Sequence, residues 1–111
     1  MNAVNDFDNF DEPCPPAPVP PGALVREMRI VNKKGLHARA TAKFVQCAEK
    51  FEADITVTRC GETVGGSSIM GLLTLAAAQG TTITVTARGD QAREALDALT
   101  RLVGDRFGEG E

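Results

Sequence analysis

The stretch TTITVTAR, residues 81–88, carries the clearest strand pattern in this chain. Ile83, Val85 and Ala87 alternate with polar residues, so a strand would place them on one face and the threonines on the other. Strands with one apolar and one polar face are typical of an antiparallel sheet that is covered on one side. This stretch therefore predicts a sheet with helices on a single face.

Three other segments complete the predicted sheet. Residues 24–31 and 53–59 show the same period of two. The pair Cys60-Gly61 predicts a turn that leads into a short strand at residues 62–65.

Three segments between and after these strands favour helices. Residues 38–50 hold one apolar stripe at helical spacing, and residues 68–78 predict a brief helix with Ser68 as its N-cap. The last helix is expected to begin after Asp90 as N-cap and to close at Gly104. The order β-α-β-β-α-β-α predicts an α+β fold, with a four-stranded antiparallel sheet and three helices on one face.

An acidic, proline-rich segment precedes the predicted domain. All six prolines lie between Pro13 and Pro21, and the four acidic residues before Pro13 have no Lys or Arg among them. Proline cannot pair in a sheet or continue a helix, so we expect residues 1–22 to form a disordered or extended tail and residues 23–111 to form the domain. A docking role for DFDNFD, residues 6–11, is the alternative to a solvated tail.

The composition argues against several classes of function. Outside the tail the chain has 12 basic and 11 acidic residues, because four of its 15 acidic residues lie in the tail. So balanced a domain has no general attraction for nucleic acid. No apolar run approaches the roughly 18 residues of a membrane helix, and the N-terminus lacks the pattern of a secretory leader. We expect a monomer with no nucleic-acid partner and no membrane insertion.

The three cysteines, Cys14, Cys47 and Cys60, are odd in number and widely spaced. This pattern predicts neither a disulfide framework nor a zinc site. It favours a reducing compartment and therefore a cytoplasmic protein. We expect no catalytic role for any of the three.

His37 is the only histidine in the chain and lies at the predicted start of the helix over residues 38–50. Gly35 permits an unusual backbone turn just before it, and Arg39 follows two residues later. The free amides and the positive dipole end of a helix start bind anions and disfavour a charged imidazolium. A neutral, nucleophilic ring beside a guanidinium is suited to accept a phosphoryl group and to pass it on.

Other chemistries at His37 have less support. A lone histidine is more often a structural residue, and only its neighbours favour a functional role. The chain offers no Cys/His pattern for a metal site and no nucleophile-elbow sequence for a Ser-His-Asp arrangement. A small RNA-binding module is disfavoured because the chain has no Trp and no Tyr. We expect neither a metal nor a cofactor.

A second group of candidate residues lies in GGSSIMGLL, residues 65–73. Ser68 leads the short helix, where the amides and the dipole favour a regulatory phosphate. A helix of about three turns cannot bury its whole circumference, so Ile69, Met70 and Leu73 are candidates for an exposed apolar patch. Such a patch, with a flexible methionine, is suited to docking several partners.

NKKGLHARATAKFV, residues 32–45, is followed by SSIMGLL, with 31 positions between His37 and Ser68. From residue 24 to about 107 the chain strongly resembles the HPr family, the phosphocarriers of the bacterial phosphoenolpyruvate-dependent phosphotransferase system. The resemblance implies an HPr-like open-faced β-sandwich. It also implies that His37 takes a phosphoryl group on Nδ1 from phosphorylated Enzyme I and passes it to an enzyme IIA domain, without turnover of its own.

The same resemblance implies roles for the neighbours. Arg39 matches the arginine that neutralises the phosphoryl group, and Ser68 matches the serine phosphorylated in lineages that have an HPr kinase/phosphorylase. The docking patch of the family is matched by Ile69, Met70 and Leu73.

Two residues depart from the family pattern. Ala40 stands where many members have proline, but alanine is a good helix former, so helix initiation should survive. Lys34 stands where a small polar residue often helps to bind the phosphoryl group. We expect Lys34 either to add positive charge beside His37 in partner binding or to be a solvated side chain.

Two functional questions stay open at this level. The carrier fits either sugar uptake or a regulatory, nitrogen-type cascade. A different class is a signalling adaptor, in which Ser68-phosphorylated protein binds a regulator and transfer through His37 is secondary or lost.

Overall fold

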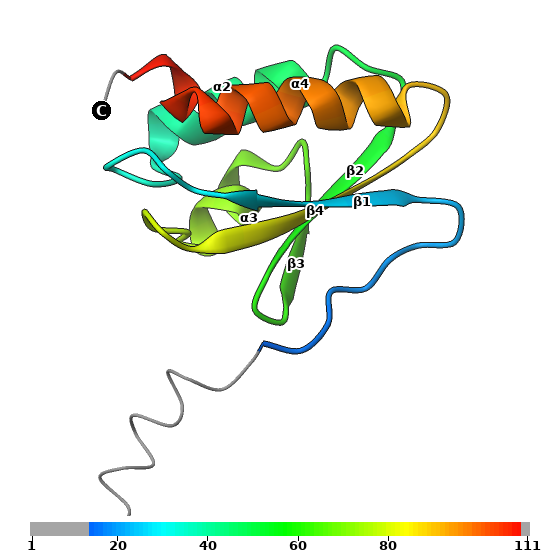
Figure 1. Cartoon of the computed structure of the whole chain (residues 1–111), viewed down its shortest axis with the longest axis horizontal. Helices are drawn as coiled ribbons and strands as arrows, with labels where there is room; N and C mark the ends of the chain where they lie inside the picture. Colours follow the sequence, from blue (N-terminus) through cyan, green and yellow to red (C-terminus); the bar gives the residue numbers. More distant parts are fainter. Residues whose placement is uncertain (1–13, 110–111) are drawn as a thin grey trace, which may run out of the picture.

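The computed structural model describes residues 14–109 of the chain. Its element order confirms the predicted alternation of strands and helices (Figure 1). The elements are β1 (Leu24–Arg29), α2 (Ala38–Ala48), β2 (Asp54–Arg59), β3 (Glu62–Gly65), α3 (Ile69–Thr74), β4 (Thr82–Arg88), α4 (Ala92–Gly104) and the short 3₁₀ turn η1 (Arg106–Gly108).

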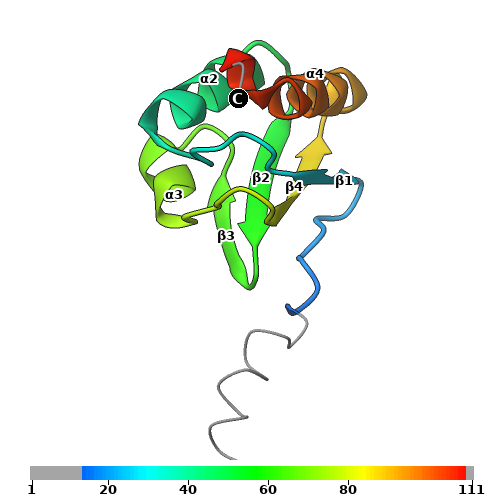
Figure 2. The same ribbon diagram turned by 60° about the vertical axis from the view of Figure 1, so that its left-hand side comes forward.

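The four strands form one antiparallel sheet in the order β1-β4-β2-β3. The register pairs Met28 with Ile83 and Val57 with Val85, which brings the apolar residues of three strands to one face. Helices α2 and α4 lie over this face, and α3 packs beside α2 (Figures 1 and 2). The predicted α+β fold is therefore confirmed.

The core lies between this sheet face and the helices. Phe44 of α2 and Leu99 of α4 are fully buried there. They share this core with Val57, Ile83 and Val85 of the sheet, which are fully buried too. Burying an apolar side chain of this size stabilises the fold by about 1.5–3 kcal/mol. Burial of the two helical stripes thus fixes how α2 and α4 sit on the sheet.

Helix α4 does not begin where the sequence predicted. Its N-cap is Gln91 and not Asp90. The amide of Gln91 donates to the carbonyl of Glu52 at 3.0 Å, and Oε1 of Gln91 accepts from the amide of Glu52 at 2.8 Å. This reciprocal pair ties the helix start to the loop before β2, so a tertiary contact overrides the local preference of Asp90 for the cap position. At the other end, Gly104 is still helical and Asp105 is the C-cap.

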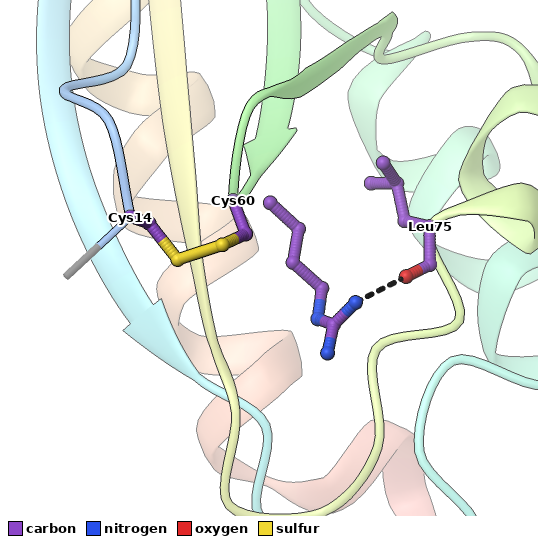
Figure 3. The surroundings of a disulfide bond; sticks show 4 residues. Cys14, Cys60 and Leu75 are labelled. Carbon is purple, nitrogen blue, oxygen red and sulfur yellow. Dashed lines mark hydrogen bonds between the residues drawn. A yellow bond between two sulfur atoms is a disulfide. The ribbon is translucent and has the colours of Figure 1, made fainter. Parts of the chain in front are cut away.

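Cys14 and Cys60 form a disulfide, so the expectation of three unpaired cysteines was wrong (Figure 3). The two residues are 46 positions apart in sequence, and no spacing rule connects them. Cys60 lies in the turn between β2 and β3 with a φ of +46°, and this turn presents its side chain to the proline-rich segment. Cys47 is the one free cysteine within residues 14–109, and partial burial raises the pKa of its thiol.

Residues 14–22 follow the sheet between two fixed points. At one end, a methyl group on Gly61 would lie 3.5 Å from Cγ of Pro15, and at the other Gly22 lies beside the side chain of Arg88. Gly61 follows the end of β2, whereas Arg88 of β4 pairs with Asp54, the first residue of β2. The segment therefore extends over the length of β2. The part of the predicted tail that is described is thus attached to the domain, while the rest, residues 1–13, lies outside the described residues.

Within residues 14–109, no helix combines the length and the apolar character that crossing a bilayer requires. The same part of the chain holds no cluster of three or more side chains that could ligate a metal ion.

Candidate functional site

The turn before α2 requires glycine at position 35. Gly35 has a φ of +68°, and a Cβ there would lie 2.5 Å from the carbonyl oxygen of Ala77. The next amide, that of Leu36, donates to the same oxygen at 2.9 Å. A side chain at position 35 would therefore collide with backbone, and this close approach fixes the direction in which the chain enters α2.

His37 lies at the predicted start of α2, where it is the N-cap. Its backbone is extended, with φ −83° and ψ −177°, and its carbonyl accepts the first helical hydrogen bond from the amide of Thr41 at 2.8 Å. The imidazole makes no capping bond to the helix and its side chain is 29% exposed. The amides of the first turn, residues 38–40, have no acceptor inside the helix, so the start of α2 is suited to bind an anion.

Three cationic side chains surround this helix start. Lys34, Arg39 and Lys43 line the same surface depression as His37, with a volume of about 540 Å³. Lys34 and Arg39 were predicted from the sequence, while Lys43 was missed. None of the ion pairs found within residues 14–109 involves Arg39, so its guanidinium is available to an anion. The site can neutralise a group that carries two negative charges.

The structure adds one carboxylate that the sequence did not indicate. Nε2 of His37 contacts Oε2 of Glu109, and the other carboxylate oxygen accepts from Nδ2 of Asn32 at 3.1 Å. Hydrogen bonding from His37 first, and then from Asn32, holds the pKa of Glu109 below its ordinary value, with the charge of Lys34 assisting and burial opposing. Glu109 is therefore ionised at neutral pH.

The segment that carries Glu109 is fastened to the domain at two further points. Phe107 is fully buried, and its carbonyl accepts from Nζ of Lys43 at 2.7 Å. Arg106 and Phe107 both have positive φ values, +56° and +54°, which non-glycine residues adopt only where their surroundings hold them. No local pattern predicts that residue 109 reaches position 37. The apolar Phe107 after the end of the predicted helix was the only hint that this segment returns to the core.

The second group of residues forms the start of α3. Oγ of Ser68 accepts from the amide of Gly71 at 3.0 Å, so the predicted N-cap is confirmed. Ile69 is 44% and Met70 is 71% exposed, while Leu73 is partly buried. Because α3 packs beside α2, the exposed side chains and the helix that begins at His37 belong to neighbouring elements (Figure 2).

Comparison with known proteins decides the family. The family model described as PTS HPr component phosphorylation site matches residues 24–105. The chain belongs to the HPr family. Phosphocarrier protein HPr of Cupriavidus necator is 48% identical over 88 residues, which cover 79% of this chain and 99% of that protein. Phosphocarrier protein NPr of Shewanella violacea is 42% identical over 86 residues, covering 78% and 94%.

Solved structures of the HPr family agree with this assignment. HPr-C-His from Thermoanaerobacter tengcongensis superposes with a TM-score of 0.75 at 42% identity, over 78% of this chain and 97% of that one. As an HPr protein, the chain is a phosphocarrier of the phosphotransferase system and works with other components of that system.

Proposed function

We propose that the protein carries a phosphoryl group on Nδ1 of His37, which it accepts from phosphorylated Enzyme I and delivers to an enzyme IIA domain. The observation that supports this most directly is the placement of His37 as the N-cap of α2, with Lys34, Arg39 and Lys43 around the same depression. An imidazole at a helix start with free amides, in a depression lined by three cations, has what a transient phosphohistidine needs.

The transfer is an exchange of one bond to phosphorus for another. The lone pair of Nδ1 attacks, the N–P bond forms, and the bond between phosphorus and the donor breaks with its electron pair going to the donor. Charge on the equatorial oxygens is stabilised by the amides of residues 38–40 and by Arg39. Because nothing on the protein is consumed, the same step in reverse hands the group to the next carrier.

We expect Arg39→Ala to lower the rate of phosphoryl acceptance from Enzyme I by about 10- to 100-fold, the effect of losing one charged hydrogen-bond donor to the phosphoryl group. Arg39→Lys should retain more activity, since it keeps the charge but not the fork of donors. Rapid-quench labelling with phosphorylated Enzyme I measures both rates, with Arg93→Ala on α4 as a matched control. Equal rates for Arg39→Ala and Arg93→Ala would remove Arg39 from the proposed site.

Partner docking is assigned to the exposed face of α3 together with Lys34. Ile69 and Met70 leave apolar surface in water next to the helix that carries His37. A partner that covers them, with Leu73 at their edge, places its own phosphorylated group at the start of α2.

Ser68 is proposed as a regulatory phosphorylation site for an HPr kinase/phosphorylase. Ser68→Asp is expected to slow acceptance from Enzyme I by about tenfold, because a charge placed in an apolar docking surface must be desolvated when the partner binds. Ser68→Ala should accept at the normal rate while losing only the helix cap, at about 1 kcal/mol of stability. Stopped-time transfer assays compare the variants, and an unchanged rate for Ser68→Asp would rule the regulation out.

A second candidate is a regulatory role in a nitrogen-type cascade. It is favoured by the similarity to a relative named NPr. A reconstituted relay with phosphoenolpyruvate, Mg²⁺ and Enzyme I, offered a sugar-type IIA domain in one tube and a nitrogen-type IIA domain in another, separates the branches by which acceptor gains phosphate. Transfer to neither, with regulator binding only by the Ser68-phosphorylated form, would favour the signalling-adaptor function instead.

The proposed location is the cytoplasm and the proposed state is a monomer. The location follows from the relay, whose donor and acceptor domains must meet the carrier by diffusion. The cysteines do not support this location, because a disulfide such as Cys14–Cys60 is typical of an oxidising compartment.

A further inference from the structure

Glu109 contacts the nitrogen of His37 that the proposed reaction does not use. The contact joins Nε2 to Oε2, and the proposed phosphoryl acceptor is Nδ1 on the other side of the ring. A carboxylate can only accept a hydrogen bond, so the proton of this contact belongs to Nε2. A neutral imidazole that carries its proton on Nε2 keeps a free lone pair on Nδ1.

The carboxylate is itself held by a dedicated partner. Nδ2 of Asn32 donates to Oε1 of Glu109 at 3.1 Å and to the carbonyl of Gly35 at 2.8 Å. Two acceptors on one nitrogen fix the orientation of this amide, which is fully buried. Asn32 thereby links the turn that sets the direction of α2 to the carboxylate that contacts His37.

The orientation of Asn32 leaves its own oxygen unsatisfied. Oδ1 of Asn32 is buried and, within residues 14–109, has no hydrogen-bond partner. Such an atom normally destabilises a fold, so its presence calls for a compensating role. The compensating role that the contacts of Asn32 indicate is to direct its NH₂ group toward Glu109.

The negative charge of Glu109 leaves the net charge of the depression positive, so the site can still bind an anion. Lys34, Arg39 and Lys43 line the depression together with Glu109, so three cations face one carboxylate. The depression keeps a net positive charge with the imidazole neutral. The negative charge is placed at Nε2, on the side of the ring away from the attacking nitrogen.

We infer that Glu109 is a positioning residue for phosphoryl acceptance: its carboxylate keeps the proton of His37 on Nε2 and so reserves the lone pair of Nδ1, while Asn32 holds Glu109 in place. This inference rests on the proposed function of His37. During transfer the N–P bond forms at Nδ1, the donor keeps the electron pair of the broken bond, and the Nε2 proton stays on the ring. The ring then carries positive charge, which the carboxylate stabilises as the aspartate of a hydrolase triad does for its histidine.

The test compares Glu109→Ala, Glu109→Gln and the control Glu49→Ala, which makes the same truncation at the far end of α2. The first readout is the ¹⁵N spectrum of the labelled ring at a pH where it is neutral, which reports the proton on Nδ1 or Nε2. It needs no partner protein, and the single histidine makes the assignment unambiguous. The second readout is the rate of acceptance from phosphorylated Enzyme I.

Wild type and Glu49→Ala should show the proton on Nε2. In Glu109→Ala the population with the proton on Nδ1 should rise toward that of a free histidine side chain, and acceptance should slow about tenfold. Glu109→Gln keeps an acceptor without the charge, so it should restore the Nε2 proton but only part of the rate. A merely structural role for Glu109 would leave the ring spectrum unchanged.

The outcomes separate this inference from the proposed function. An unchanged ring spectrum and an unchanged rate in Glu109→Ala, with wild type phosphorylated normally, would overturn the inference alone. If no protein accepts a phosphoryl group, wild type included, the proposed function fails. In that case the ring spectrum still tests Glu109, because a spectrum of Glu109→Ala that matches wild type would overturn the positioning role as well.

Discussion

His37→Ala is expected to abolish phosphoryl acceptance from Enzyme I completely while the domain stays folded. The chain has no other histidine, so no second imidazole can take over the reaction. The fold should tolerate the change because the ring makes no capping bond to α2 and is part-exposed. Labelling with phosphorylated Enzyme I measures the loss, and circular dichroism with thermal unfolding measures the fold.

Gln46→Ala is the matched control, because it changes an exposed residue of the same helix to the same side chain. It should accept the phosphoryl group at the wild-type rate. A His37→Ala protein that still passed phosphate to an IIA domain would contradict the assignment of the acceptor. Loss of the fold in His37→Ala would instead mean that the Glu109 contact is structural, and His37→Gln would then serve as the inactive, folded variant.

The second large effect is expected from the Cys14–Cys60 disulfide. Closing a loop with a sequence separation of 46 restricts the unfolded chain, and the chain-entropy relation gives about 4 kcal/mol as the upper limit of the stabilisation. We expect Cys14→Ser to lower the free energy of unfolding by about 2–4 kcal/mol, measured by urea denaturation of the oxidised protein. Phosphoryl acceptance should be unchanged, since the disulfide joins the β2–β3 turn to residues 14–22 and not to α2.

Non-additivity provides the internal control. Cys14→Ser, the double variant with Cys60→Ser, and reduced wild type should fall to nearly the same stability, because each lacks the same cross-link. Alkylation before and after reduction should count one thiol and then three, the first being Cys47. Three reactive thiols in the unreduced protein, or a stability that reductant leaves unchanged, would show that the cross-link does not form in solution.

The sequence predicted the parts of the fold that depend on local pattern. The alternation in residues 81–88 placed Ile83 and Val85 on the buried face, and Ser68 capped its helix as expected. The prediction of Asp90 as the N-cap of α4 was wrong because Gln91 is hydrogen-bonded to Glu52, which is far away in sequence. The cysteine pairing was missed for the same reason: Cys14 and Cys60 meet only after the segment before β1 lies along the sheet.

The candidate site shows the same division. Gly35, His37 and Arg39 lie within five residues, so a single stretch of sequence predicted where they sit. The contacts of Asn32 and Lys43 with residues 107–109 depend on the buried Phe107, which brings the end of the described chain back to α2. No periodicity of the sequence reports such a contact, because it is made by a segment after the last helix.

Phosphoryl transfer to this protein can be measured directly by intact-mass spectrometry of the purified protein after incubation with phosphoenolpyruvate, Mg²⁺ and Enzyme I from the same cell. If His37 is the acceptor, the protein gains one phosphoryl group that is labile to acid and maps to His37. No gain under these conditions, with labelling only at Ser68 by a nucleotide-dependent kinase, would contradict it and leave the signalling adaptor as the better description.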